Sequence, residues 1–177
     1  YDEALRRAMR EAPNVIMIGE IRDRASMQHA LHYAESGHLC VSTLHANNAN
    51  QAVQRIVNFF PDQAHRQLLM DLSLNLQAVV AQRLVKNMHG SVVPAMEVML
   101  LTPYVSELIQ KGQIDEIKTA IARSGEQGMC TFDQSLFELY ERGVISPAEA
   151  VANADNRTDV SLRLRMASGA PVGGEGM

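Results

Sequence analysis

Apolar residues near the start of the chain follow two different spacings. Residues 15–18 include no polar position, which is typical of a parallel strand covered on both faces. From 24 to 35 the apolar residues recur at helical spacing, with Asp23 in the N-cap position and Gly37 at the stop. The apolar positions of this helix face are Met27, Ala30, Leu31 and Ala34. A second apolar run covers 39–44, so a strand, a crossover helix and a parallel second strand are predicted.

Two polar side chains follow the predicted strands directly. Glu20 comes just past the carboxyl end of the first strand and His45 just past the second. Both are therefore expected at one edge of the sheet, where open parallel sheets bind ligands. A carboxylate orients or deprotonates water, and an imidazole donates to a phosphate or senses its loss. This makes Glu20 and His45 candidate catalytic residues; the simpler interpretation is a helix-entry charge and a surface loop residue.

The rest of the chain is predicted to be mainly helical. Helices are expected from 50 to 60 and, after Pro61 and capped by Asp62, from there to about 80. A hairpin is expected next, formed by 82–85 and 93–101 around Gly90. After Thr102-Pro103, the segments expected to be helical are 104–111, 114–123, 131–141, 147–153 and 158–167. One apolar stripe among them is expected to be core: Leu136, Phe137, Leu139 and Tyr140.

These segments suggest three parts. Residues 1–101 are expected to be an α/β part that carries Glu20 and His45, 102–167 a helical subdomain, and the Gly-rich stretch 168–177 a disordered tail. With 177 residues, 46% hydrophobic content and a net charge of −4, the chain has enough apolar residues for one core and no basic excess for a nucleic-acid groove. No stretch approaches the ~18 to 20 apolar residues of a membrane span, and no signal peptide is visible. Two distant cysteines favour reduced thiols in the cytoplasm.

Several motifs in a fixed order resemble the secretion and pilus ATPase superfamily. Gly19-Glu20-Ile21-Arg22-Asp23 resembles its Walker B segment, and Gly37-His38-Leu39 with Thr43-Leu44-His45 its His box. Segments 44–52, 58–61, 69–73 and 131–140 are similar to the type IV pilus retraction ATPases of the PilT/PilU twitching-motility family, more closely to the PilU branch. The similarity runs from residue 1 to about 165.

This resemblance implies a RecA-like ATPase core that uses ATP and Mg²⁺, with Glu20 activating water and His45 contacting the γ-phosphate. It nominates four nucleotide-binding residues: Gly19, Arg22, Thr43 and His38. His38 is nominated by the resemblance alone, because it precedes a strand and so belongs at the opposite sheet edge. The implied protein is an accessory-type, ATP-hydrolysing subunit of pilus retraction and twitching motility. It would act in a homo-oligomeric ring, presumed hexameric, in the cytoplasm at the inner membrane.

The implied partners are the principal retraction ATPase and the inner-membrane pilus platform protein; no nucleic acid and no direct membrane insertion are expected. No Gly-x-x-x-x-Gly-Lys-Ser/Thr loop occurs in the 177 residues, so the phosphate cradle is missing. The first residue is not Met, and the sequence there predicts a helix with an apolar face formed by Leu5, Ala8, Met9 and Ala12. It is therefore expected to be a C-terminal fragment, inactive alone and an ATPase when full length.

Two departures bear on the branch of the family. Pilus-extension and secretion ATPases carry a four-cysteine zinc module where this chain has residues 86–90, and the chain has only Cys40 and Cys130. The principal retraction ATPase has Ala-Ile-Arg after Thr-Pro, whereas here Tyr104 follows. These favour the accessory paralogue. The alternatives are a non-hydrolysing accessory subunit that depends on the principal ATPase, and a related secretion or pilus-assembly ATPase.

Three further features have ordinary structural interpretations. His29 and His32 lie three apart on one predicted helix, but no third ligand is nearby, so no metal site is predicted. Arg22 either pairs with Asp23 or contacts nucleotide. Arg83 either forms a salt bridge within the chain or reaches another subunit.

Overall fold

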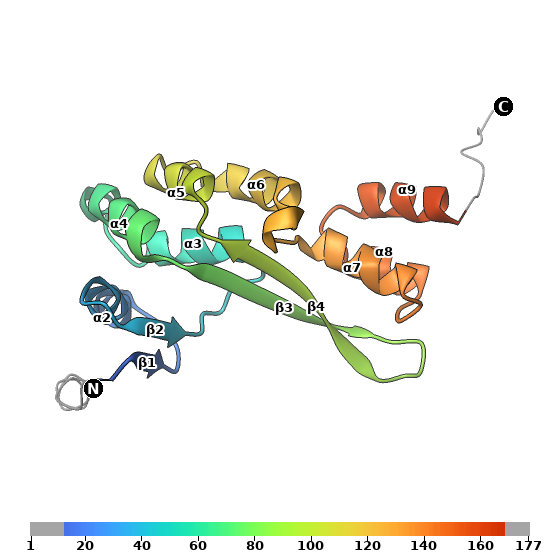
Figure 1. Cartoon of the computed structure of the whole chain (residues 1–177), viewed down its shortest axis with the longest axis horizontal. Coiled ribbons are helices and arrows are strands. Elements are labelled where there is room, and N and C mark those ends of the chain that lie inside the picture. The colour runs from blue at the N-terminus through green and yellow to red at the C-terminus, as the bar shows by residue number, and fades with distance from the viewer. Residues whose placement is uncertain (1–12, 169–177) are drawn as a thin grey trace. The chain divides into compact units, whose positions relative to one another are not determined.

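The structure is a computed structural model that describes residues 13–168 (Figure 1). These residues form two compact units. The first comprises 13–77 with 101–116, and the second comprises 78–100 with 117–168. This grouping differs from the expected division after residue 101, because the segment 78–100 belongs with the C-terminal helices. The helix predicted within 1–12 and the tail 169–177 lie outside the described residues.

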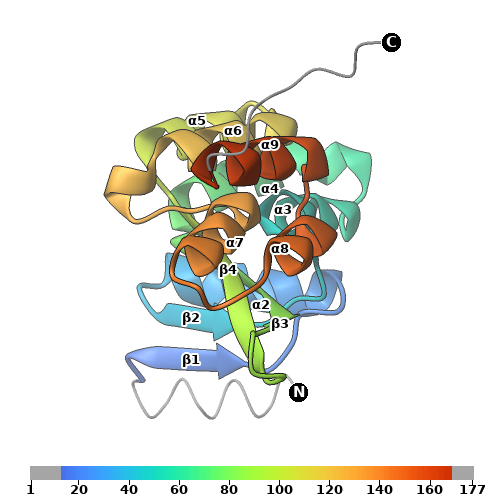
Figure 2. The same ribbon diagram turned by 90° about the vertical axis from the view of Figure 1, so that its right-hand side faces the viewer.

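The first unit begins with the predicted strand, helix and strand. These are β1 (Val15–Ile18), α2 (Arg24–Glu35) and β2 (Leu39–Ser42). The two strands are parallel and in register from Val15 opposite Leu39 to Ile18 opposite Ser42 (Figure 2). The predicted crossover is therefore confirmed.

A capping box starts α2, as the sequence predicted for Asp23. The Asp23 carboxylate accepts the backbone N–H of Ser26 at 2.8 Å, and the Ser26 hydroxyl oxygen accepts the backbone N–H of Asp23 at 3.3 Å. The hydrogen bonds from Ser26 lower the pKa of Asp23 below its usual value. Met27, Ala30 and Leu31 of the predicted face are buried; Tyr33 is buried as well.

The prediction that β1 is covered on both faces is wrong for the described residues. Ile16 and Ile18 are buried, whereas the side chains of Val15 and Met17 are 54% and 73% exposed. Successive strand residues point to opposite faces of a sheet, and only one face of β1 is covered by residues 13–168. β2 also ends at Ser42, two residues earlier than predicted, where its register with β1 ends.

Helices complete the first unit. They are α3 (Ala49–Asn58), α4 (Asp62–Asn75), α5 (Pro103–Gln110) and the 3-10 turn η1 (Ile114–Glu116), and α4 packs against α5 (Figure 1). α4 is shorter than predicted, because Val79 and Val80 pair in a strand, as β-branched residues favour. Asp62 is the first residue of α4 rather than its cap; the N-cap position is held by Pro61.

The second unit is built on an antiparallel hairpin. β3 (Ala78–Lys86) pairs with β4 (Val92–Leu100) along its whole length, from Ala78 opposite Leu100 to Lys86 opposite Val92. The hairpin was predicted, but β3 begins four residues earlier than expected. Gly90 has φ +82° in the connecting turn, a conformation that glycine adopts without strain.

Short helices cover the other part of the second unit. They are α6 (Ile117–Arg123), the 3-10 turn η2 (Gly125–Gln127), α7 (Phe132–Glu141), α8 (Pro147–Asn153) and α9 (Arg157–Ala167). Their core holds Phe132 and Leu136, both fully buried, with Phe137, Leu139 and Tyr140 packed against it. The core position is therefore confirmed for Leu136, the other three residues of the stripe are partly buried at its edge, and Phe132 was missed. Among residues 13–168, no helix combines the length and the apolar character that crossing a bilayer requires.

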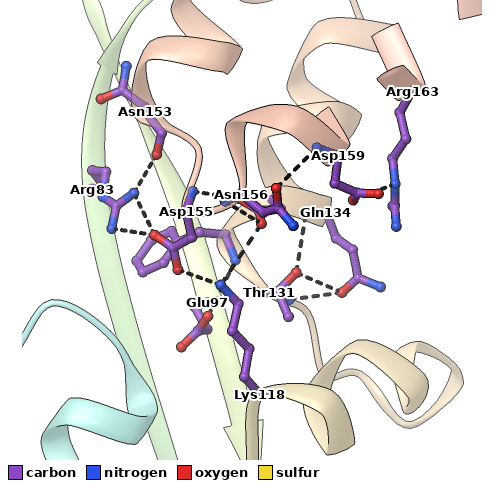
Figure 3. Close-up of polar contacts among 12 residues, drawn as sticks. Arg83, Glu97, Lys118, Thr131, Gln134, Asn153, Asp155, Asn156, Asp159 and Arg163 are labelled. Atoms are coloured by element: carbon purple, nitrogen blue, oxygen red, sulfur yellow. Dashed lines mark hydrogen bonds and ion pairs between the residues drawn. The ribbon is translucent and has the colours of Figure 1, made fainter. Parts of the chain in front are cut away.

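Arg83 of β3 is bound inside the second unit (Figure 3). Its guanidinium lies 3.2 Å from Asp155 Oδ1, donates to the carbonyl of Asn153, and sits 4.3 Å from the centre of the Phe132 ring. Lys118 Nζ of α6 lies 2.9 Å from Asp155 Oδ2. Of the two interpretations of Arg83, the salt bridge within the chain is confirmed.

The carboxylate of Asp133 extends this network to the backbone. It is buried at the start of α7 and accepts the N–H groups of Asp155 and Asn156 at 2.8 and 3.1 Å. Asp155 and Asn156 lie between α8 and α9, so β3, α6 and α7 all hold this connection. Side-chain charge therefore fixes where α9 begins.

The charge of Asp155 is itself stabilised by its partners. Burial would raise the pKa of Asp155, but the hydrogen bonds and positive charges of Lys118 and then Arg83 outweigh it, and the pKa lies below the usual value of 3.8. The folded second unit therefore favours the ionised carboxylate.

We expect Arg83→Ala to destabilise the second unit by about 1–3 kcal/mol, because it removes charge-assisted hydrogen bonds and the contact with Phe132. Urea dependence of amide hydrogen exchange in α7 measures this change. Arg142→Ala is the matched control, because Arg142 pairs with Glu138 on an exposed surface, and its effect is expected within about 0.5 kcal/mol. Equal effects of the two substitutions would contradict the structural role of Arg83.

The Asp155 ion pairs are expected to make stability fall in acid. A carboxylate with a lowered folded-state pKa contributes stability above its unfolded pKa of about 3.9, and loses it as the pH falls through the folded value. Asp155→Asn is therefore expected to be less stable than the parent protein at about pH 6, with the difference shrinking below about pH 4. Hydrogen exchange of α9 amides at the two pH values measures it, and a pH-independent difference would refute the ion-pair origin.

Candidate functional site

Two loops are joined at the carboxyl ends of β1 and β2. The backbone N–H of Ile21 donates to the carbonyl of Thr43 at 2.9 Å, and the Thr43 hydroxyl donates to the carbonyl of Gly19 at 2.5 Å. These bonds continue the pairing of the strands past their ends. They fix the backbone on both sides of Glu20.

The carboxylate of Glu20 is held by one partner on each oxygen. Arg22 Nε lies 2.5 Å from Oε2, and His45 Nε2 lies 2.8 Å from Oε1. The side chain of Glu20 is 20% exposed, whereas those of Arg22 and His45 are 78% and 82% exposed. The predicted meeting of Glu20 and His45 at one sheet edge is confirmed; their catalytic roles stay predictions.

The loop that carries His45 is anchored where α3 begins. The Asn48 side chain accepts the backbone N–H of Gln51 at 2.9 Å, and the Gln51 side chain accepts the backbone N–H of Asn47 at 3.3 Å. Asn48 followed three residues later by Gln51 is an N-cap signal in the sequence that was not recognised there. His45 is thus held between β2 and a capped helix.

Arg22 pairs with Glu20 rather than with Asp23. The predicted partners of Arg22 were Asp23 or nucleotide, and Glu20 was not foreseen. Asp23 is engaged in capping α2 instead. The available signal is that Glu20 and Arg22 are two residues apart in the short connection between β1 and α2, a spacing that favours one side in extended backbone.

His38 is not brought to this site. It precedes β2, at the opposite end from His45, and its backbone N–H donates to the carbonyl of Tyr33 at 3.1 Å. Its Nδ1 lies 3.0 Å from the Ser36 hydroxyl, and its ring meets the Tyr33 ring edge-on with centroids 6.4 Å apart. The structure thus gives His38 a place in the turn after α2, while its predicted nucleotide contact stays a prediction.

His29 and His32, for which no metal site was predicted, both lie on α2. The rings of His29 and His32 lie 6.4 and 5.8 Å from the Tyr33 ring, measured between centroids. Across residues 13–168, no three side chains of His, Cys, Asp or Glu are grouped as a metal site requires.

The donor set around Glu20 suits a nucleotide's phosphates better than a metal cage. Arg22 and His45 place exposed nitrogen donors beside the carboxylate, and guanidinium and imidazole both bind phosphate oxygens. Mg²⁺ keeps several water ligands and is bound partly through phosphate oxygens, so the lone carboxylate of Glu20 does not by itself make a metal cage. The backbone cradle for phosphates is absent from the 177 residues.

A family model described as "Type II/IV secretion system protein" matches residues 1–153. The type IV pilus ATPase PilU of Pseudomonas aeruginosa is 52% identical over 169 residues, which cover 95% of this chain and 44% of that protein. The type IV pilus retraction ATPase PilT of the same organism is 39% identical over 150 residues, covering 85% of this chain and 44% of that protein. The chain thus spans less than half the length of these relatives.

Solved structures of related ATPases have the same fold. The pilus retraction motor PilT with bound ADP matches with a TM-score of 0.78 and 34% identity, over 89% of this chain and 44% of that one. The ATPase DotB of Yersinia pseudotuberculosis matches with a TM-score of 0.74 and 26% identity, over 90% of this chain and 39% of that one. The predicted α/β fold of a RecA-like ATPase core with a helical C-terminal part is confirmed.

Because the family model covers 153 of the 177 residues and the relatives by sequence and by structure agree with it, the chain belongs to the type II/IV secretion system protein family, with type IV pilus retraction ATPases among its relatives.

Proposed function

We propose that this chain is part of an ATP-hydrolysing motor subunit of type IV pilus retraction, and that Glu20 activates the attacking water. The observation that carries the proposal is the carboxylate of Glu20, held at the carboxyl ends of two parallel strands between Arg22 and His45. A ligand of an open parallel sheet binds at this edge. The names of the relatives support the reaction: PilU and PilT are both called pilus ATPases.

Glu20 is suited to the role of general base by its surroundings. Its side chain is one-fifth exposed, so water reaches it, and its backbone is held by the bond from Ile21 to Thr43. Transfer of a phosphoryl group to water asks mainly that the water be oriented and the charge be stabilised. Glu20 orients the water and accepts its proton; Mg²⁺, when bound, neutralises charge on the phosphate oxygens.

His45 is the second residue of the proposal. Its ring is far more exposed than Glu20 and stands on a separate loop, so it is free to exchange its partner. An imidazole N–H that leaves Oε1 has a γ-phosphate oxygen as its natural acceptor. His45 would thus stabilise the transferring group, and a nucleoside diphosphate would not engage it.

Gly19 and Thr43 act here on the backbone of the loops. The Thr43 side-chain hydroxyl donates to the Gly19 carbonyl, so these residues shape the loops that meet the nucleotide. The full-length protein would supply the phosphate loop, and this chain alone would not hydrolyse ATP. A homo-oligomeric ring, contacts with the principal retraction ATPase and the pilus platform protein, and a cytoplasmic site at the inner membrane complete the proposal.

In the full-length protein, we expect Glu20→Gln to keep ATP affinity and to slow hydrolysis by about 10²–10⁴, because an amide cannot accept the proton. Single-turnover hydrolysis and nucleotide binding measure the two effects. Glu35→Gln is the control, since Glu35 is an exposed carboxylate at the end of α2. Near-normal turnover of Glu20→Gln with normal ATP affinity would remove Glu20 from the catalytic role, whereas a parent protein without turnover would favour the alternative of a non-hydrolysing accessory subunit.

His45→Ala in the full-length protein is expected to lower the turnover number more than the affinity for ADP, because ADP lacks the γ-phosphate. Dissociation constants for ADP and ATP, compared with turnover, separate the two. His89→Ala is the control, since His89 is an exposed histidine in the turn between β3 and β4. Equal losses of ADP and ATP binding with lower thermal stability would mean that His45 only holds its loop.

A further inference from the structure

The two partners of the Glu20 carboxylate differ in how they are attached. Arg22 belongs to the same short segment as Glu20, between the end of β1 and the start of α2. The backbone N–H of Ile21 bonds to the carbonyl of Thr43, and that of Arg22 lies 3.3 Å from the Ser26 hydroxyl oxygen. His45 stands on the other loop, beyond β2. Arg22 is therefore attached to Glu20 through the backbone of one segment, whereas the ring of His45 reaches Glu20 from another loop, two residues beyond the bonded Thr43.

The difference in attachment between Arg22 and His45 matters because the Glu20 carboxylate can rotate about its last bond. The terminal torsion of a glutamate is broad, so a carboxylate held by the backbone alone still rotates about its last bond. A donor fixed on Oε2 sets the plane of the carboxylate and thereby the direction of the lone pairs on Oε1. Arg22 Nε, 2.5 Å from Oε2, provides that fixed donor.

We propose that Arg22 is a positioning residue for Glu20. It holds Oε2 in place, so that Oε1 points in a fixed direction when His45 leaves it and it accepts a hydrogen bond from the attacking water. This inference rests on the proposed function, and it gives Arg22 a task other than the nucleotide contact implied by the family resemblance. The guanidinium acts through the carboxylate and touches neither the water nor the γ-phosphate.

The test uses the full-length protein with Arg22→Gln and Arg22→Lys. We expect Arg22→Gln to lower kcat by about 10- to 100-fold, because loss of alignment at a reacting group costs up to about 10² in rate. The dissociation constants for ADP and for a non-hydrolysable ATP analogue are expected to stay within about twofold, since these depend on uniform binding contacts. Arg22→Lys keeps the charge and is expected to fall between the parent protein and Arg22→Gln.

A double variant shows whether Arg22 acts through Glu20. If it does, Glu20→Gln combined with Arg22→Gln is no slower than Glu20→Gln alone, because the second change has no carboxylate left to align. Arg66→Gln is the control: Arg66 is an exposed arginine on α4, far in sequence from Glu20, and its kcat is expected to match the parent.

Each other outcome overturns the inference in a recognisable way. A weaker nucleotide affinity with unchanged kcat would make Arg22 a nucleotide contact, and multiplicative losses in the double variant would make it independent of Glu20. A normal kcat in Arg22→Gln beside a slow Glu20→Gln would remove Arg22 and leave the proposed function standing. Normal turnover in Glu20→Gln would overturn the proposed function itself. Because Arg22 is 78% exposed, its substitution leaves the core intact, and thermal unfolding checks this.

Discussion

The parallel pairing of β1 with β2 is the constraint on which the candidate site depends. Its register sets Ile18 opposite Ser42, so both strands end at the same level. The next residues are then joined by the Ile21 to Thr43 and Thr43 to Gly19 hydrogen bonds. A slip of one residue would turn every side chain of one strand to the other face, and Glu20 and His45 would no longer meet.

The ion pairs around Glu20 in the first unit and around Asp155 in the second unit have different roles. Around Glu20 both partners are exposed, and His45, which reaches the carboxylate from another loop, can leave Oε1 when a ligand arrives while Arg22 stays on Oε2. Around Asp155 the partners are more buried, and hydrogen bonds from Arg83 and Lys118 reinforce the ion pairs. The first arrangement suits a site that exchanges partners. The second suits a joint that fixes the start of α9.

Predictions from local signals were reliable where the cause is itself local. Asp23 caps α2, as predicted, because its side chain reaches a backbone N–H three residues away, and the structure shows the same kind of cap, not predicted, at Thr131 of α7 and Ser146 of α8. The C-terminal end of α4 was predicted poorly. Residues after Asn75 follow a helical apolar pattern, yet pairing with β4 draws them into β3. The burial of β1 was misjudged for a related reason, since an apolar run does not say which face the rest of the chain covers.

The sequence by itself determined the order of strand, helix and strand, and hence that Glu20 and His45 follow parallel strands at one edge, because a crossover connection leaves the carboxyl ends of both strands at the same edge. It also determined the family, through motifs kept in a fixed order. Tertiary structure alone decided the partner of Arg83, which holds Asp155 of a loop 72 residues away. The physical reason is that an ion pair depends on distances of a few ångströms between side chains, which the folded backbone sets and the spacing of residues along the chain does not.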